Sequence, residues 1–171
     1  DFSVPSEGYG QFLVDVFHEW YEHDVGQIYV SQFDNLLGQW LGYPSTTCVH
    51  QPTCGQSLVT EANGDVYACD HFVYPEYKVG NLTQQPLTEI VLSSKQQQFG
   101  LEKSQKLTAL CRHCEFRKLC YGGCPKHRFI SLENEPNPHN YLCASYRYFF
   151  EQTAPYMQAM ARQIRLHPSA A

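Results

Sequence analysis

The sequence predicts a small, cysteine-rich α+β fold in which a β-hairpin and helices surround two metal-cluster sites, preceded by a short α/β fragment. Three observations predict it. Eight cysteines occur in 171 residues, and four of them form the motif C-x2-C-x5-C-x3-C between Cys111 and Cys124. Asn63-Gly64 separates two short strand-like runs, which is typical of a hairpin. Apolar side chains recur at helical spacing toward the ends of the chain.

Composition indicates a globular protein. The sequence is 43% hydrophobic and 14% aromatic, so it can build a core. Its net charge is -5, and no basic cluster supports nucleic-acid binding. The apolar runs are far too short to span a membrane, and no signal peptide is recognisable. We therefore expect a cytoplasmic protein with neither nucleic acid nor membrane as a partner.

The first 47 residues predict helix, strand and helix. Residues 8–23 have the pattern of an amphipathic helix with one face in a core. That face consists of Phe12, Leu13, Val16, Phe17 and Trp20. Residues 27–33 alternate apolar and polar side chains like a strand, and Asp34 is placed to cap a short helix through Trp40. Such a fragment cannot close a sheet alone, and the sequence starts with Asp rather than Met. We therefore expect a piece of a longer protein.

The middle of the chain predicts a hairpin between cysteines. A linker at 42–45 leads to Cys48 and Cys54 in a loop, and residues 57–60 and 65–69 read as strands. Cys69 ends the second strand, directly before Asp70. Residues 77–82 read as irregular or extended, 86–92 as a short helix, and 94–104 as a solvated helix.

The last part of the chain predicts a polar loop and a helix. Residues 133–138 form the loop, and the helix starts at Tyr141, passes through Cys143 and reaches about Arg165. Pro155 is expected to break or restart it. We divide the chain into terminal elements and linker at 1–47, a twin-cluster domain at 48–143, and a helical segment at 144–171.

The cysteine spacing indicates metal ligands. Disulfide scaffolds are usually shorter and lack a core, whereas this chain carries 10 Phe, 12 Tyr and 2 Trp. Eight cysteines make two sets of four, and tetrathiolate sites hold zinc or an iron–sulfur cluster. Only Cys111 and Cys114 have the short spacing of a zinc knuckle. The wider spacings elsewhere slightly favour a cluster, because its four iron corners lie farther apart than the ligands of one zinc ion. Spacing alone also allows a local site made of Cys111, Cys114, Cys120 and Cys124.

The spacings of all eight cysteines resemble the SPASM domain of radical S-adenosylmethionine enzymes. The resemblance covers about residues 48–143 and includes the C-x5-C spacing from Cys48, the Gly64 to Cys69 turn and the C-x2-C-x5-C-x3-C motif. With the Cys69-Asp70 dipeptide and the trailing helix, it most closely resembles the C-terminal part of anaerobic sulfatase-maturating enzymes. Residues 1–47 then resemble the last elements of a truncated radical-enzyme barrel, a partial TIM barrel.

This resemblance implies two auxiliary [4Fe–4S] clusters with crossed ligands. An upstream set would consist of Cys48, Cys54, Cys69 and Cys124. A downstream set would consist of Cys111, Cys114, Cys120 and Cys143. Cys124 thereby leaves its sequence neighbours to complete the upstream set. Zinc can occupy such thiols in an isolated fragment that has lost its clusters.

The same resemblance implies that Asp70 is a general base in the parent enzyme. Without the resemblance, an aspartate after a strand is usually a solvated or turn-capping residue. As a base it would accept the proton of the substrate side chain, with a pKa that burial would raise toward a useful value. Four histidines also neighbour the cysteines, where supporting or surface roles are expected: His50, His71, His113 and His127.

The resemblance implies a parent enzyme that oxidises a Cys or Ser of a sulfatase polypeptide to Cα-formylglycine. The clusters would carry the surplus electron or hold the architecture. The C-x3-C-x2-C motif of the radical cluster is absent from these 171 residues, so S-adenosylmethionine and a third cluster are expected only in the full-length parent. No turnover is expected from this chain alone. Alternative functions are a SPASM domain of another peptide-modifying maturase and a zinc-binding interaction module.

Overall fold

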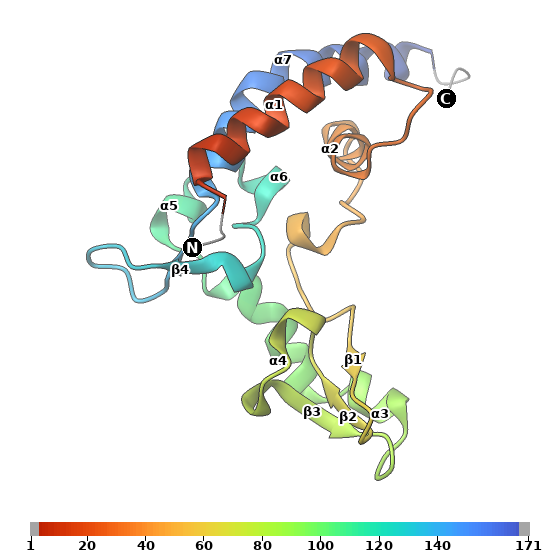
Figure 1. Cartoon of the computed structure of the whole chain (residues 1–171), viewed down its shortest axis with the longest axis vertical. Helices are drawn as coiled ribbons and strands as arrows, with labels where there is room; N and C mark the ends of the chain where they lie inside the picture. The colour runs from red at the N-terminus through yellow and green to blue at the C-terminus, as the bar shows by residue number, and fades with distance from the viewer. Residues whose placement is uncertain (1–3, 168–171) are drawn as a thin grey trace.

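The structure is a computed structural model that describes residues 4–167, so the ends of the two outer predicted segments, 1–3 and 168–171, lie outside it. The chain is elongated, with three long helices at one end and a small sheet at the other (Figure 1). The cysteine-rich motif runs between these two parts. This arrangement confirms the predicted α+β class.

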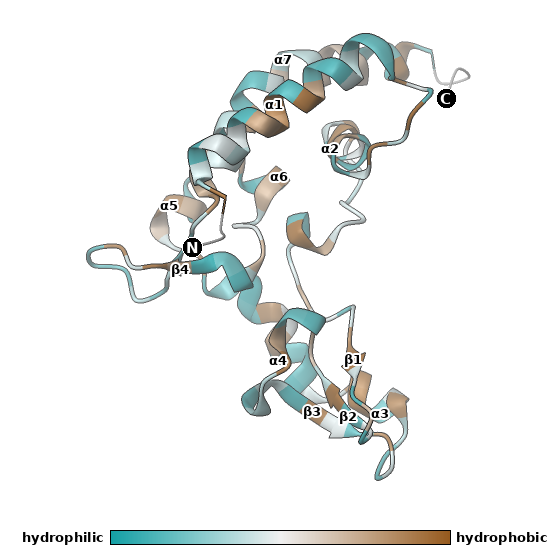
Figure 2. Cartoon of the chain, in the orientation of Figure 1, coloured by the Kyte–Doolittle hydropathy of each residue, from teal (hydrophilic) through white to brown (hydrophobic). Residues whose placement is uncertain are grey.

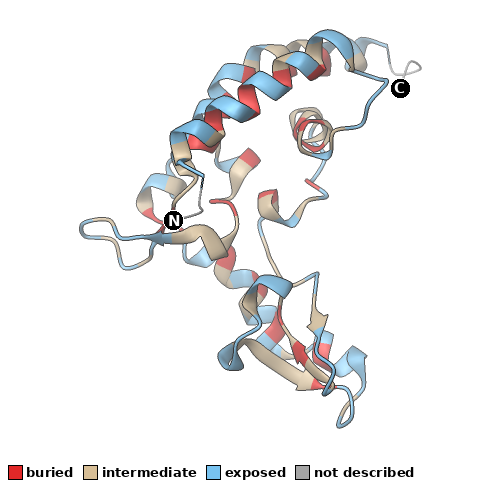
Figure 3. Ribbon diagram, viewed as in Figure 1, coloured by how far each residue is buried: buried red, intermediate tan, exposed pale blue. Residues whose placement is uncertain are grey.

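Helices α1 (Ser6–His23), α2 (Ser31–Leu41) and α7 (Cys143–Leu166) pack together around one aromatic core. The helix predicted at 8–23 is confirmed as α1, which lies alongside α7 (Figure 1). Leu13, Phe17 and Trp20 of its predicted core face are buried, whereas the prediction is wrong for Phe12 and Val16, which are exposed. Phe17 is completely buried, and its ring packs edge-to-face against Phe33 and Phe149 at centroid distances of 5.4 and 6.2 Å. Buried residues gather where the helices meet, while their outer faces are largely hydrophilic (Figures 2 and 3).

The strand expected at 27–33 is wrong. The chain turns after α1 and enters α2 at Ser31. The turn uses backbone groups that a strand would need, since the carbonyl of Ile28 accepts a hydrogen bond from Trp20 Nε1 at 2.9 Å. Asp34 does stabilise the start of α2, because its Oδ2 accepts from the Val30 amide at 2.8 Å. Residues 4–47 therefore contribute helices rather than an α/β fragment.

The interruption expected at Pro155 is also wrong, because α7 continues through it. Proline removes one helical hydrogen bond and crowds the preceding turn. Pro155 lies on the exposed face of α7, where water can satisfy the freed carbonyl, while Thr153 and Met157 beside it are buried. Packing of the opposite face against the core holds the helix together.

The predicted hairpin is confirmed and gains a third strand. Strands β1 (Val59–Thr60), β2 (Asp65–Tyr67) and β3 (Lys78–Asn81) form an antiparallel sheet in that order. Val59 faces Tyr67 and Val66 faces Gly80 in the register. The residues expected to be irregular or extended thus form β3. The short helix expected at 86–92 is α3 (Leu87–Val91), whose Ile90 is fully buried.

Helix α4 (Ser94–Gln105) connects the sheet to the cysteine motif. It was expected to be solvated, but Gln96 and Lys103 are buried, with exposed fractions of 3% and 1%. Gln96 Nε2 donates to the carbonyl of Gly55 at 2.8 Å. One face of α4 therefore covers the loop that carries Cys54.

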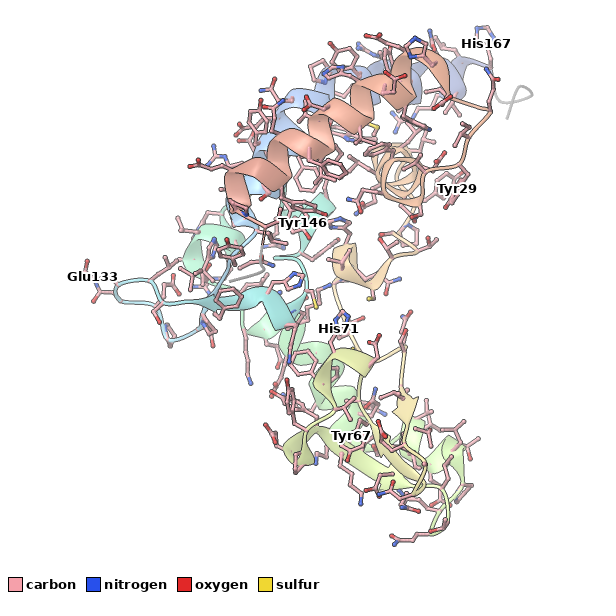
Figure 4. All side chains as sticks on the ribbon, in the orientation of Figure 1. Tyr29, Tyr67, His71, Glu133, Tyr146 and His167 are labelled. Atoms are coloured by element: carbon pink, nitrogen blue, oxygen red, sulfur yellow. The ribbon has the colours of Figure 1, made fainter. Side chains whose placement is uncertain are left out.

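Short elements frame the motif itself. They are α5 (Ala109–Arg112), α6 (Arg117–Cys120) and a two-stranded sheet of β4 (Arg128–Ile130) and β5 (His139–Asn140). The polar loop predicted at 133–138 joins these two strands, and Glu133 lies at its tip (Figure 4). Within residues 4–167, no helix has both the length and the apolar character needed to cross a bilayer.

Candidate metal centres

All eight cysteines are free thiols and lie within the middle of the molecule or at the start of α7. Cys48 opens a short 3-10 helix (Cys48–His50), and Cys69 directly precedes another (Asp70–Phe72). Cys120 ends α6, and Cys143 begins α7. Elements that are far apart in the sequence therefore supply thiols to one region.

The four thiols of the downstream set share one cavity. A cavity of about 480 Å³ is lined by Cys111, Cys114, Cys120 and Cys143 together with apolar and aromatic groups. Burial raises the pKa of Cys120 to about 12, and the nearby Cys143 and Cys111 add to this shift. Burial likewise raises the pKa of Cys143 to about 11, with Cys111 and Cys114 adding to it. This cavity therefore brings all four thiols of the downstream set to one site.

In the upstream set, Cys124 interacts electrostatically with each of the other three thiols. Burial raises the pKa of Cys54, and the thiolates of Cys124 and Cys48 raise it further. Burial raises the pKa of Cys69 to about 12, with a smaller contribution from Cys124. Burial is also the main cause of the raised pKa of Cys124, and the Cys48 thiolate raises this pKa further. In each of these cases the cysteines that raise the pKa belong to the same predicted set.

The spacing of the thiols is wider than a zinc ion requires. Tetrahedral Zn–S bonds of about 2.3 Å bring the four sulfurs to within about 3.8 Å of one another. Among the described residues, the only three ligand side chains with donor atoms all within 4.8 Å of one another are Cys69, Asp70 and His71. Neither cysteine set draws together that tightly. Both sets therefore fit a larger object, such as an iron–sulfur cluster, better than a single ion.

The turn between Cys120 and Cys124 separates the two sets. Tyr121, Gly122 and Gly123 all have positive φ values, of 49, 72 and 62°. Such left-handed conformations suit glycine, so the chain can reverse within three residues. Asn140 Nδ2 holds the turn by donating to the Gly122 carbonyl at 2.9 Å. The side chain of Cys124 thereby turns away from the cavity that holds Cys120.

Asp70 lies beside the upstream set but is not buried as expected. Its Oδ1 accepts hydrogen bonds from Cys69 Sγ at 3.1 Å and from the His71 amide at 3.0 Å. The Cys69 hydrogen bond is the main reason why the pKa of Asp70 lies below its ordinary value. The expected increase in pKa through burial is therefore wrong for the free chain. The carboxylate is ionised and open to an approaching molecule, as a general base requires.

Three histidines lie in the core or beside the thiols. His50 is 2% exposed, and burial lowers its pKa to about 4; its Nε2 lies 2.9 Å from Gln32 Nε2. His71 Nδ1 lies 3.7 Å from Cys124 Sγ, at the junction of the sheet with the rest of the chain (Figure 4). His139, which sequence reasoning missed, lies 3.8 Å from Cys111 Sγ.

Two other histidines contact no thiol by a hydrogen bond. His113 Nδ1 lies 2.9 Å from the carbonyl of Ala109 on an exposed surface. Burial lowers the pKa of His127, and the nearby His71 lowers it further. Surface and supporting positions were expected for both.

Sequence reasoning also missed two cations between the cysteine sets. Lys103 comes from α4 and Arg128 from β4, and both side chains bind backbone carbonyls around the thiols. The composition around Lys103 gave no indication of burial, because its neighbours are mostly glutamine, serine and lysine.

Comparison with known proteins gives these centres a family context. The sequence model of the SPASM family, described as an iron–sulfur cluster-binding domain, matches residues 48–115. The match contains five of the eight cysteines, and the last three follow it in the sequence.

Curated relatives match nearly the whole chain. A serine-type anaerobic sulfatase-maturating enzyme of Bacteroides thetaiotaomicron is 44% identical over 96% of this chain, which corresponds to 40% of that enzyme. A cysteine-type anaerobic sulfatase-maturating enzyme of Clostridium perfringens is 32% identical over 96% of this chain and 45% of the enzyme. The chain thus spans about two fifths of the length of these relatives.

Solved structures show the same fold. The structure named native anSMEcpe with bound AdoMet and Kp18Cys peptide matches with a TM-score of 0.82 and 33% identity. It covers 96% of this chain and 45% of that chain. A second structure, native anSMEcpe with bound AdoMet, matches with a TM-score of 0.82 and 32% identity, again over 96% of this chain and 45% of that one. The match falls on the C-terminal part of these structures.

Proposed function

We propose, from the premise that residues 48–115 form an iron–sulfur cluster-binding SPASM domain, that this chain is the auxiliary-cluster part of an anaerobic sulfatase-maturating enzyme. The observation that supports the proposal is that four of the eight free thiols line one cavity that Cys124 does not line. The other four form a group around Cys124, which the turn at Gly122-Gly123 directs away from that cavity.

Each group would hold one [4Fe–4S] cluster through four thiolates. The upstream ligands are Cys48, Cys54, Cys69 and Cys124. The downstream ligands are Cys111, Cys114, Cys120 and Cys143. Thiolates are the usual ligands of such clusters, and aromatic and apolar surroundings limit access of water. When bound, the clusters would supply one-electron redox chemistry.

The whole enzyme would oxidise a Cys or Ser side chain of a sulfatase polypeptide to Cα-formylglycine in the cytoplasm. Both relatives are sulfatase-maturating enzymes, and one matching structure holds a bound peptide. S-adenosylmethionine and a third cluster belong to the longer protein, so the present chain supplies no turnover alone. Among the residues of this chain, Asp70 would accept the proton of the substrate thiol or hydroxyl, since its carboxylate is exposed beside Cys69.

The first test is the content of iron, sulfide and zinc in protein prepared without oxygen. About eight irons and eight sulfides per chain are expected for two cubane clusters. Two zincs without iron, even after anaerobic reconstitution, would contradict the proposal and favour a zinc-binding module instead.

A pair of double variants tests the crossed ligands. The variant Cys48→Ser/Cys124→Ser removes two ligands of one proposed cluster, so about half of the iron should remain. Cys120→Ser/Cys124→Ser removes one ligand of each cluster, so most of the iron should be lost. A local site made of Cys111, Cys114, Cys120 and Cys124 predicts the opposite order. The two iron contents therefore decide between the two ligand arrangements.

A further inference from the structure

Lys103 is a buried cation without an acidic partner. Its side chain is 1% exposed, and no carboxylate of the described residues lies within ion-pair distance of it. Its Nζ donates to the carbonyls of Cys48 at 2.5 Å and Val49 at 3.1 Å. Burial of a lone ammonium group is costly, and carbonyl dipoles offset only part of that cost. An anion close to Lys103 would remove the remaining penalty.

Arg128 is a second, partly buried cation, which connects Lys103 to the turn between Cys120 and Cys124. Its Nη1 donates to the carbonyl of Lys103 at 2.7 Å. Its Nε and Nη2 donate to the carbonyls of Gly122 at 3.2 Å and Tyr121 at 3.0 Å. Within residues 4–167, Arg128 also forms no ion pair with a carboxylate. The two cations therefore lie in series between the loop of Cys48 and the turn that separates the cysteine sets.

The thiols that surround each cation differ. Burial lowers the pKa of Lys103, and the cysteines that oppose this shift are Cys54, Cys48 and Cys124, all of the upstream set. Burial also lowers the pKa of Arg128, but the opposing cysteines come from both sets: Cys111, Cys54, Cys120 and Cys124. The hydrogen bonds agree with this difference. Lys103 binds the carbonyls of Cys48 and Val49, beside the upstream set, whereas Arg128 binds the carbonyls of the Tyr121–Gly122 turn, which lies between Cys120 of the downstream set and Cys124 of the upstream set.

We propose that Lys103 and Arg128 compensate the negative charge of the bound clusters and raise their reduction potentials, with Lys103 acting on the upstream cluster and Arg128 on both. This inference rests on the proposed function, in which each cysteine set holds a cluster. A cubane with four thiolate ligands carries about two net negative charges and gains a further one on reduction. A nearby cation stabilises the reduced form more than the oxidised form. Removal of the cation therefore lowers the potential.

The test is an anaerobic redox titration of the full-length, cluster-loaded protein, followed by electron paramagnetic resonance. Lys103→Met removes the charge and keeps an unbranched side chain of similar length. The midpoint of the third cluster of the full-length protein is assigned separately. Of the two auxiliary-cluster midpoints, we expect one to fall and the other to stay at its wild-type value. Lys103→Arg keeps the charge and should leave both midpoints near wild type. Lys106→Met is the matched control, because Lys106 directly follows the same helix but is exposed and pairs with Glu102 at 2.7 Å.

The results separate a charge effect from a structural one. Unchanged midpoints in Lys103→Met with full iron content would overturn the inference, and an equal fall of both midpoints would overturn the assignment of Lys103 to one cluster. If Lys103→Met loses iron, retention of iron by Lys103→Arg supports charge compensation, and equal loss contradicts it. Wild-type protein that holds no clusters would instead contradict the proposed function.

Arg128 gives an independent comparison. Arg128→Met should lower both midpoints, because this residue faces both sets. Arg128→Lys keeps a positive charge but loses part of the hydrogen bonding to the turn, so both midpoints should stay closer to wild type than in Arg128→Met. A fall confined to one cluster in Arg128→Met would contradict the position assigned to this residue.

Discussion

Replacement of Gly122 by alanine tests whether the turn between Cys120 and Cys124 keeps the two cysteine sets apart. Gly122 has a φ of +72°, and its carbonyl accepts hydrogen bonds from Arg128 Nε and Asn140 Nδ2. The substitution Gly122→Ala changes no ligand and no charge. Its effect therefore reports the geometry of the turn and of the side chains packed against it.

The expected cost comes from two terms. A residue with a side chain loses roughly 1–2 kcal/mol in the left-handed conformation. The new Cβ would lie 2.5 Å from Leu107 Cδ2 and 2.9 Å from Arg128 Nη2, so both neighbours have to move. Overpacking of this kind typically adds about 1–3 kcal/mol. The sum of about 2–5 kcal/mol corresponds to a fall of at least about 4 °C in the thermal midpoint, at roughly 2–4 °C per kcal/mol for a chain of this size.

The assay combines the thermal midpoint, taken at one fixed heating rate, with the iron content after anaerobic reconstitution. Gly122→Ala should melt at a lower temperature and lose iron, because the side chain of Cys124 no longer reaches its set. Gly38→Ala is the control, since its Cβ would meet nothing within 4 Å and alanine is more favourable in a helix by about 0.5–1 kcal/mol. A Gly122→Ala protein with full iron and a wild-type midpoint would refute the reasoning.

Three further substitutions, one of them with a matched control, separate chemistry from stability. In the full-length enzyme, Asp70→Asn should keep the iron content but reduce the rate of formylglycine formation by roughly 10²–10⁴-fold. This rate is measured by mass spectrometry of a sulfatase peptide, and a wild-type rate would exclude Asp70 as the base. Phe17→Ala should reduce the free energy of unfolding by about 3–5 kcal/mol, because Phe17 is completely buried. Phe12 is 58% exposed, so Phe12→Ala should reduce it by less than about 0.5 kcal/mol. Equal losses of the two variants in urea unfolding would contradict the assigned core. Pro155→Ala should raise the same free energy by about 2 kcal/mol, since it restores a helical hydrogen bond on an exposed face; a less stable variant would show that the proline fits its helix better than we infer.

Local sequence patterns predicted those helices and strands that are specified by residues close together in the sequence. The Asn63-Gly64 pair specifies the hairpin by its own backbone preferences, and the spacing of Phe17 and Trp20 specifies the buried face of α1. The run at 27–33 alternates like a strand, but alternation does not reveal that no partner strand lies beside it among the described residues. Here the hydrogen bond between Trp20 and Ile28 belongs to a turn instead.

The site was predictable as a set of thiols but not as a geometry. Spacing predicted the eight cysteines as ligands, whereas the partition around Cys124 came from a family resemblance and stays a prediction. Lys103 was unpredictable because its helix is polar on most faces, and only tertiary packing decides which lysine is buried. Asp70 was expected to be buried, but the strand before it ends at Tyr67, so the carboxylate lies at an exposed turn.

The interleaved order of the cysteines also determines when each centre can be completed during synthesis. Cys124 lies 76 residues after Cys48, and both belong to the proposed upstream set. At about 5–20 residues per second, roughly 4–15 s therefore pass between the synthesis of the first and the last thiol of this set. During that interval three thiols of the downstream set also emerge from the ribosome, but their fourth partner, Cys143, comes last. The nascent chain therefore presents two incomplete and overlapping sets of reactive thiols at the same time. In the proposed ligand arrangement, the Tyr121–Gly123 turn has to form before Cys124 can join the upstream thiols, so this short segment links the completion of one centre to the folding of the other.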